Sequence, residues 1–323
     1  MSDRTQDVPV LIIGYNRPHH LARLIDRLRQ VRPTKVYVAI DGPRPGHPDD
    51  PSEVTACHRL VDTIDWSCRI ETLFQVENLG CGAGVTAAIS WFLESEPEGI
   101  ILEDDVIPHL RFFPYCAILL ERFRHDQRVF AISGSNMTSQ SALEVPEAPY
   151  RFSRIPHIWG WATWRDRWQY HRLDISDWRE TLDAETIWDA TGGSLTGTLF
   201  WGSVFHSVGR GYVDTWDAQL VHASMRLGGL TATSNVNLTE NIGTGPDATH
   251  LRGPIPGAQP VGSLTFPLEE VPVVWDAKAD AWTRTHHFQV NVMARRALLI
   301  RNPEFQDFVS EVRKLALSSP HPQ

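Results

Sequence analysis

The stretch that decides the fold is EGIILEDDVIPHLRFF, residues 98–113. Its apolar run, IIL, leads directly into Glu103, Asp104 and Asp105 before apolar sequence resumes. A short continuous apolar run of this kind predicts a strand that is buried on both faces. Three adjacent carboxylates repel one another and resist burial, so their position at the end of such a strand needs a physical reason.

Strand and helix patterns alternate on both sides of this stretch through the first 135 residues. The expected strands are residues 8–14, 35–40, 69–76, 99–104 and 128–133, and the expected helices are residues 18–31, 52–65, 85–95 and 109–124. Repeated βαβ units predict an α/β fold with a mainly parallel central sheet flanked by helices. Ligands bind at the carboxyl ends of the strands in such sheets, where Asp41 and the acidic triplet fall.

The composition changes after residue 135. Eight of the twelve tryptophans lie between Trp159 and Trp216, among many Gly, Thr and Ser residues. We predict one domain over residues 1–250, with a nucleotide-binding half (1–135) and an acceptor half (136–250). Residues 251–323 are expected to form a C-terminal extension, with a loop or linker followed by a helix around residues 286–300.

The bulk composition excludes several classes of function. A net charge of −9 argues against a nucleic-acid or anionic-membrane partner, which would require a basic surface. The four cysteines have neither CxxC nor zinc spacing, which indicates reduced thiols. No apolar run approaches the roughly 20 residues of a membrane helix, and the polar N-terminus lacks the apolar core of a signal peptide. We expect a soluble, cytoplasmic protein with no transmembrane segment.

The acidic triplet admits two interpretations. One is a solvated loop that happens to be acidic. The other is a site for Mg²⁺ or Mn²⁺, which one or two carboxylates hold together with the phosphates of a substrate. The position at the carboxyl end of a predicted central strand favours the second. The rival phosphate motifs are missing, because the chain has no GxxxxGK[ST] and its first strand ends in GYNRPHH rather than GxGxxG.

Seven segments in order carry a resemblance to a known family. They are PVLIIGYNRP (9–18), VAIDG (38–42), ENLGCGAGV (77–85), GIILEDDVIPHLRFF (99–113), HIWGWATW (157–164), VDTWDAQL (213–220) and ENIGTGPDATH (240–250). Together they resemble the GT-A fold glycosyltransferases, specifically the family that includes the Golgi N-acetylglucosaminyltransferase I and related bacterial nucleotide-diphospho-sugar transferases. The resemblance implies a Rossmann-like fold and a UDP-sugar donor. It does not cover the residues after 251.

The resemblance also implies roles for residues on the donor side. Arg17 and Asp41 would hold the uridine, with Asp41 accepting from the edge of the base. Asn78 and Gly80 would lie along the nucleotide or the donor sugar.

At the reaction centre, the resemblance makes Asp105 the direct protein ligand of Mn²⁺ or Mg²⁺. Glu103 and Asp104 would bind hydroxyls of the donor sugar and the ribose. Asp217 matches the general base at the first acid of a W-D-D sequence, although the second acid is Ala218 here. The alternative for Asp217 is a helix cap or a paired structural acid.

Two further residues are candidates. His250, at the end of a Gly-rich loop expected to close over the donor, could contact the metal or the diphosphate, although a surface position is its default. Trp161, Trp164 and Trp168 have helical spacing, which indicates a buried face. We expect Trp164 and Trp168 in the core, and Trp161 in the wall that contacts a sugar.

The leading hypothesis is a metal-dependent inverting glycosyltransferase. It would transfer N-acetylglucosamine or a related hexose from a UDP-sugar to a hydroxyl acceptor that the sequence does not identify (a glycan, lipid-linked sugar, natural product or peptide). The alternatives are a sugar-1-phosphate nucleotidylyltransferase, for which GYNRPHH is a poor first loop, and a non-catalytic nucleotide-sugar-binding protein.

Overall fold

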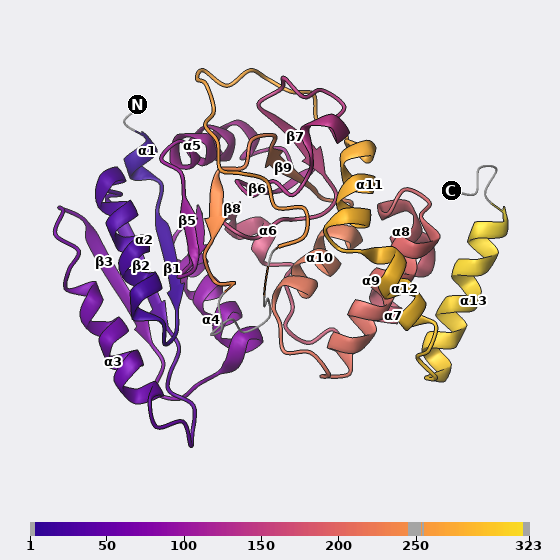
Figure 1. Ribbon diagram of the computed structural model, residues 1–323, viewed down its shortest axis with the longest axis horizontal. Coiled ribbons are helices and arrows are strands. Elements are labelled where there is room, and N and C mark those ends of the chain that lie inside the picture. The colour runs from indigo at the N-terminus through magenta and orange to yellow at the C-terminus, as the bar shows by residue number, and fades with distance from the viewer. Residues whose placement is uncertain (1–3, 245–252, 254, 319–323) are drawn as a thin grey trace.

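A computed structural model describes residues 4–244, 253 and 255–318. Its centre is an eight-stranded sheet with the order β3-β2-β1-β4-β8-β6-β9-β7 (Figure 1). The strands of this sheet are β1 (Val10–Gly14), β2 (Lys35–Ile40), β3 (Arg69–Phe74), β4 (Glu98–Glu103), β6 (Val129–Ser133), β7 (Tyr150–Ser153), β8 (Trp161–Trp164) and β9 (Leu230–Ser234). Two short strands, β5 (Val106–Pro108) and β10 (Thr239–Asn241), pair antiparallel beside it.

Helices surround the sheet and form a separate group towards the C-terminus (Figure 1). They are α1 (Arg4–Asp7), α2 (Pro18–Val31), α3 (Asp50–Val61), α4 (Gly80–Ser95), α5 (Phe112–Phe123), α6 (Arg165–Trp168), α7 (Trp178–Thr181), α8 (Ala184–Ala190), α9 (Leu195–Gly209), α10 (Asp217–Arg226), α11 (Ala277–His286), α12 (Val290–Ala297) and α13 (Pro303–Ser318), with a 3-10 turn at Gln140–Ala142.

The predicted α/β fold with a mainly parallel sheet is confirmed. The strands β1, β2, β3 and β4 pair in parallel, as do β6 and β9. All five predicted strands are present within two residues of the expected bounds. Helix α4 begins at Gly80 rather than at Val85, because the glycine-rich turn is itself the first helical turn.

Strands β5, β7, β8, β9 and β10 were not predicted. Strand β8, from the second half of the sequence, lies between β4 and β6 and is antiparallel to both. The helical interpretation of the tryptophan spacing is therefore wrong, because Trp161 and Trp164 lie on this strand and only Trp168 is helical. The expectation that Trp164 and Trp168 are core residues is confirmed, since both are buried.

Each face of the sheet has its own core. On β1, Val10 and Ile12 pack with α2, α3 and α5, whereas Leu11 and Ile13 pack with α4 on the other face. Alternate side chains of β1 point to opposite faces of the sheet, and both sets are buried. For this reason β1 appears in the sequence as an unbroken apolar run.

A third core joins the C-terminal helices to helices of residues 136–250. Helices α12 and α13 pack with α8, α9 and α10, and Phe305 and Phe308 of α13 are fully buried there. The predicted division at residue 250 therefore does not separate two bodies of packing. The single helix expected around residues 286–300 corresponds to α12, and α11 and α13 were missed.

All four cysteines are free thiols. Within the described ranges, no helix has both the length and the apolar character needed to cross a membrane.

Candidate active site

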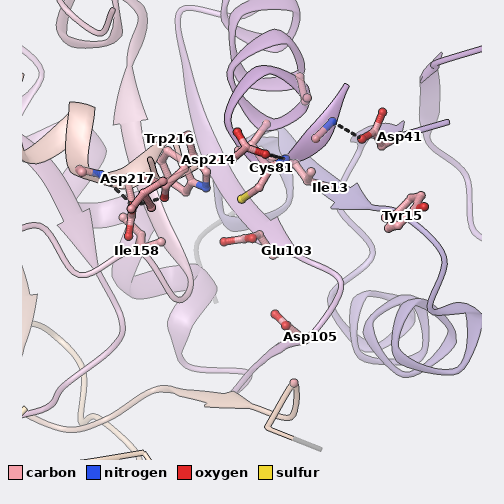
Figure 2. A pocket seen from close by; sticks show the side chains of 18 of the residues that line it. Ile13, Tyr15, Asp41, Cys81, Glu103, Asp105, Ile158, Asp214, Trp216 and Asp217 are labelled. Carbon is pink, nitrogen blue, oxygen red and sulfur yellow. Dashed lines mark hydrogen bonds between the residues drawn. The ribbon is translucent and has the colours of Figure 1, made fainter. Parts of the chain in front are cut away.

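A cavity of about 1560 Å³ opens at the carboxyl ends of β1, β2 and β4. Figure 2 shows Asp41 and Tyr15 on one side of it and Asp217 on the other, with the carboxylates of Glu103 and Asp105 between them. The sheet brings these groups together because parallel strands end at one edge.

Arg17 is the counter-ion of the acidic triplet. Its guanidinium donates one hydrogen bond to Asp104 and lies 3.0 Å from the carboxylate of Asp105. Both acids are thus neutralised in part by one cation that presents several donors in a plane. This pairing explains how two of the three acids, Asp104 and Asp105, are held at the strand end. It differs from the predicted role of Arg17, because the guanidinium is directed to the acids.

Glu103 lies half-buried in the cavity wall. Burial, together with the negative charges of Asp105, Asp104 and Asp217, raises the pKa of Glu103 above the usual range of a glutamate. Burial also raises the pKa of Asp104, although the charge of Arg17 opposes that shift.

Cys81 lines the same cavity, but its thiol is not suited to nucleophilic attack. Burial and the nearby charges of Glu103, Asp214 and Asp217 raise the pKa of Cys81 to about 12. Since the thiolate is the reactive form, this environment argues against covalent catalysis by Cys81.

Asp105 fits the role of a metal ligand that shares the ion with a substrate. The described residues contain no group of three or more His, Cys, Asp or Glu side chains that could hold a metal ion by themselves. One or two carboxylates are sufficient when phosphates supply further oxygens. Asp105 faces the cavity, and the buried Oδ2 of Asp104 makes no hydrogen bond with any described residue.

Because Gly243 has no side chain, it leaves room for the carboxylate of Asp105. A Cβ atom at residue 243 would lie only 2.1 Å from Oδ2 of Asp105. The backbone on either side is also fixed, since Ile242 donates to the carbonyl of Asp105 at 2.8 Å and Gly243 donates to Asn241. Residues 241–243 therefore lie closely around the acid.

Asp41 holds the turn that precedes α4. One of its carboxylate oxygens accepts from the backbone N–H groups of Gly42 and Leu79, and the other accepts from Asn78 Nδ2 and the N–H of Gly80. A carboxylate offers about four acceptor positions, so all are used. The predicted contact of Asp41 with the edge of a base would need one of these bonds to open, whereas Asn78 and Gly80 line the cavity as expected.

Asp214 is a functional candidate that the sequence interpretation missed. Its carboxylate accepts from the N–H groups of Cys81 and Gly82, at 2.9 Å each, and so supplies an anion to the N-terminus of α4. Cβ atoms at Gly80 or Gly82 would lie 2.6 Å from its oxygens. The segment VDTWDAQL contained Asp214, but nothing in its local pattern indicated a partner in the other half of the chain.

Asp217 lies at the first position of α10 and faces the cavity. Thr215 donates its hydroxyl to Asp217 Oδ1, which also accepts from the N–H of Ala218 at 2.8 Å. Asp217 therefore also makes local structural hydrogen bonds, as the alternative interpretation of this residue expected in part. Oδ1 carries both of these bonds.

Asp50 holds three residues that line the cavity, Tyr15, Asn16 and Arg44. Its buried carboxylate accepts from Tyr15, from Asn16 at 2.9 Å and from Arg44 at 2.8 Å. Arg44 and these hydrogen bonds hold the pKa of Asp50 well below its usual range. The contact ties the GYNR loop to the proline-rich loop after β2. The acid sits in a polar run, PDDP, that gave no sequence signal of burial.

Two predicted site residues have other outcomes. Trp161 is 1% exposed and stacks on Trp216 at 5.6 Å between ring centroids, so its predicted place in a sugar-contacting wall is wrong. Trp159 and Trp216 line the cavity instead. Strand β8 directs Trp161 into the core shared with α4. His250 lies outside the described residues.

No protein-family model matches the sequence.

Proposed function

We propose that the protein is a metal-dependent inverting glycosyltransferase that uses a UDP-sugar, with N-acetylglucosamine or a related hexose as the transferred group. The observation that carries the proposal is that Asp105 and Asp217, from opposite halves of the chain, line one cavity. The resemblance described above supports the same assignment.

The proposed chemistry divides between the two acids. Asp217 accepts the proton of an acceptor hydroxyl as its oxygen attacks the anomeric carbon, so the sugar configuration inverts in one step. A divalent ion held at Asp105 would stabilise the departing diphosphate. Glu103, which lines the cavity, would bind a hydroxyl group of the donor, whereas Asp104 is buried and holds Arg17. No covalent intermediate is required.

The arrangement supports the nucleotidylyltransferase alternative less well. A nucleotidylyltransferase needs a basic first loop that is free to act on a triphosphate, whereas Arg17 is paired with Asp104 and Asp105. A binding protein would leave the glycosidic bond intact.

The test is donor hydrolysis. Nucleotide sugars are incubated with Mn²⁺, and release of UDP and free sugar is measured for the wild type, for Asp105→Asn and for Asp307→Asn, an exposed acid on α13. We expect Mn²⁺-dependent hydrolysis that Asp105→Asn abolishes and Asp307→Asn retains. Equal metal dependence in both variants would reject the assignment of Asp105, and no hydrolysis of any nucleotide sugar would reject the function.

A further inference from the structure

The cavity continues beyond Asp217 into a region of different chemistry. We define the apolar wall as the six large side chains that line this region: Phe200, Trp201, Val204, Val208, Phe288 and Met293. Helices α9 and α12 supply most of it and pack side by side (Figure 1). The wall and the acids line one continuous cavity.

The helix α9 presents one stripe to this region. Phe200, Ser203, Val204, Ser207 and Val208 follow the i, i+3, i+4, i+7, i+8 spacing of one helix face, and all five line the cavity. The two serine hydroxyls donate to backbone carbonyls one turn earlier, at 2.7 Å each. The stripe therefore offers a ligand few hydrogen-bond donors.

Residues of α10 continue the lining of the cavity from the stripe on α9 to the proposed base, Asp217. On α10, Asp217 is followed by Ala218 and, one turn later, by Val221, and all three line the cavity. Asp217 thus lies at the boundary between a polar half with Arg17 and Arg44 and a half whose lining residues beyond the acids, among those the structure describes, carry no charge.

We infer that the acceptor is an amphipathic small molecule whose reacting hydroxyl meets Asp217 and whose apolar aglycone lies on the apolar wall. The inference rests on the proposed function for the identity of the hydroxyl as the reacting group. The continuity of the cavity orders the two parts, because among the lining residues that the structure describes, the polar donor region lies on one side of Asp217 and the wall on the other. A polar glycan would leave its hydroxyls unpaired against the wall.

The wall also has an open end. Met293 is 38% exposed and Tyr212 is 76% exposed, and both line the cavity. An apolar chain longer than the wall can therefore leave the cavity over these side chains. This geometry suits an alkyl chain of variable length.

The test is binding of a homologous series. Calorimetry with saturating UDP measures the affinity of methyl, butyl and octyl β-D-glucopyranosides, each below its critical micelle concentration. We expect affinity to rise about three- to fourfold for each methylene that reaches the wall, with a negative heat-capacity change. An octyl glycoside that binds no more tightly than the methyl glycoside would overturn the inference.

Two neighbouring residues of α12 provide a matched pair. Met293→Gln alters a residue of the wall and Val292→Thr alters an exposed residue that lies outside the cavity lining, and each change keeps the shape of the side chain. We expect Met293→Gln to lower the octyl-to-methyl affinity ratio at least about threefold, and Val292→Thr to leave it unchanged. Equal ratios in the two variants would place the alkyl chain elsewhere and reject the wall.

The outcomes separate this inference from the proposed function. The affinity ratio is measured without a donor sugar, so it tests the wall even if no nucleotide sugar is consumed. Chain-length-dependent binding without donor hydrolysis would reject the transferase and retain the apolar ligand. Donor hydrolysis without chain-length dependence would retain the transferase and reject the apolar ligand.

Discussion

The carboxylate of Asp214 accepts a hydrogen bond of 2.9 Å from the backbone N–H of Gly82, 132 residues earlier in the sequence. This contact joins the segment that precedes α10 to the first turn of α4, which the other half of the chain supplies. Because the acid meets the positive end of a helix dipole, it stabilises the turn and fixes the segment that carries Asp217 at the same time.

Replacing Asp214 by Asn should destabilise the fold. The change Asp214→Asn removes the negative charge and turns one acceptor oxygen into a donor that faces an N–H group. We expect the free energy of unfolding in urea to fall by about 1–3 kcal/mol. Glu94→Gln, at an exposed position of the same helix, is the control and should change stability by less than about 0.5 kcal/mol. Equal stability of the two variants would show that the contact contributes nothing.

Adding one methyl group at residue 243 should disturb the metal site without altering any acid. In Gly243→Ala, the new Cβ would overlap the carboxylate of Asp105 and force it to move. We expect the rise in melting temperature that Mn²⁺ produces in the presence of UDP to be lost, as in Asp105→Asn. A Gly243→Ala variant with the full Mn²⁺ response would contradict the close packing of these two residues.

Asp217→Asn should separate catalysis from donor binding. Asparagine keeps the oxygen that accepts from the N–H of Ala218 but cannot accept a proton from a hydroxyl group. We expect the rate of transfer to fall about 10²- to 10⁴-fold with little change in the affinity for UDP. Titration calorimetry with UDP and initial rates of transfer measure the two quantities. A small loss of rate would leave Asp217 with its structural hydrogen bonds alone.

The raised pKa of Glu103 predicts a specific dependence of stability on pH. Between the ordinary pKa of a glutamate, roughly 4.3, and the raised value, the native state holds a proton that the unfolded state has lost. Stability therefore falls as pH rises through this window. Glu103→Gln carries no such penalty, so its free energy of unfolding should increase relative to the wild type as pH rises from about 4 to about 8.

Urea unfolding of both proteins at several pH values measures this difference. Asp307→Asn is a suitable control, because the residue is exposed and lies far along the chain on α13. Parallel curves for the wild type and Glu103→Gln would mean that Glu103 ionises in the fold as it does in the unfolded chain.

Local pattern was sufficient to predict the first half of the sheet. The strands β1, β2 and β4 are buried on both faces, and this burial appears in the sequence as unbroken apolar runs. The ends of these strands then located Glu103 and Asp105 at one edge, because parallel strands end together. These inferences need only neighbouring residues and a rule of topology.

The partners of the site residues could not be predicted in the same way. Asp214 and Asp50 have their roles because they contact residues elsewhere in the chain, and the residues beside them in the sequence do not indicate those contacts. Trp161 was misplaced for a related reason. Tryptophans at i, i+3 and i+7 fit one face of a helix, but the four residues of β8 fit a strand equally well. The pairing of these residues with β4 and β6 makes them a strand, and such long-range pairing is not visible in the local sequence.

The position of β8 limits how the molecule can open or be rebuilt. Because β8 hydrogen-bonds to β4 on one edge and to β6 on the other, the two halves cannot swing apart as rigid lobes without breaking two ladders at once. Access to the cavity must then come from loops and side chains around its rim. For the same reason, a chimera that exchanges the second half of the chain would have to rebuild the ladder between β4 and β8 at the centre of the sheet, whereas changes on α9 and α12 would leave that ladder intact.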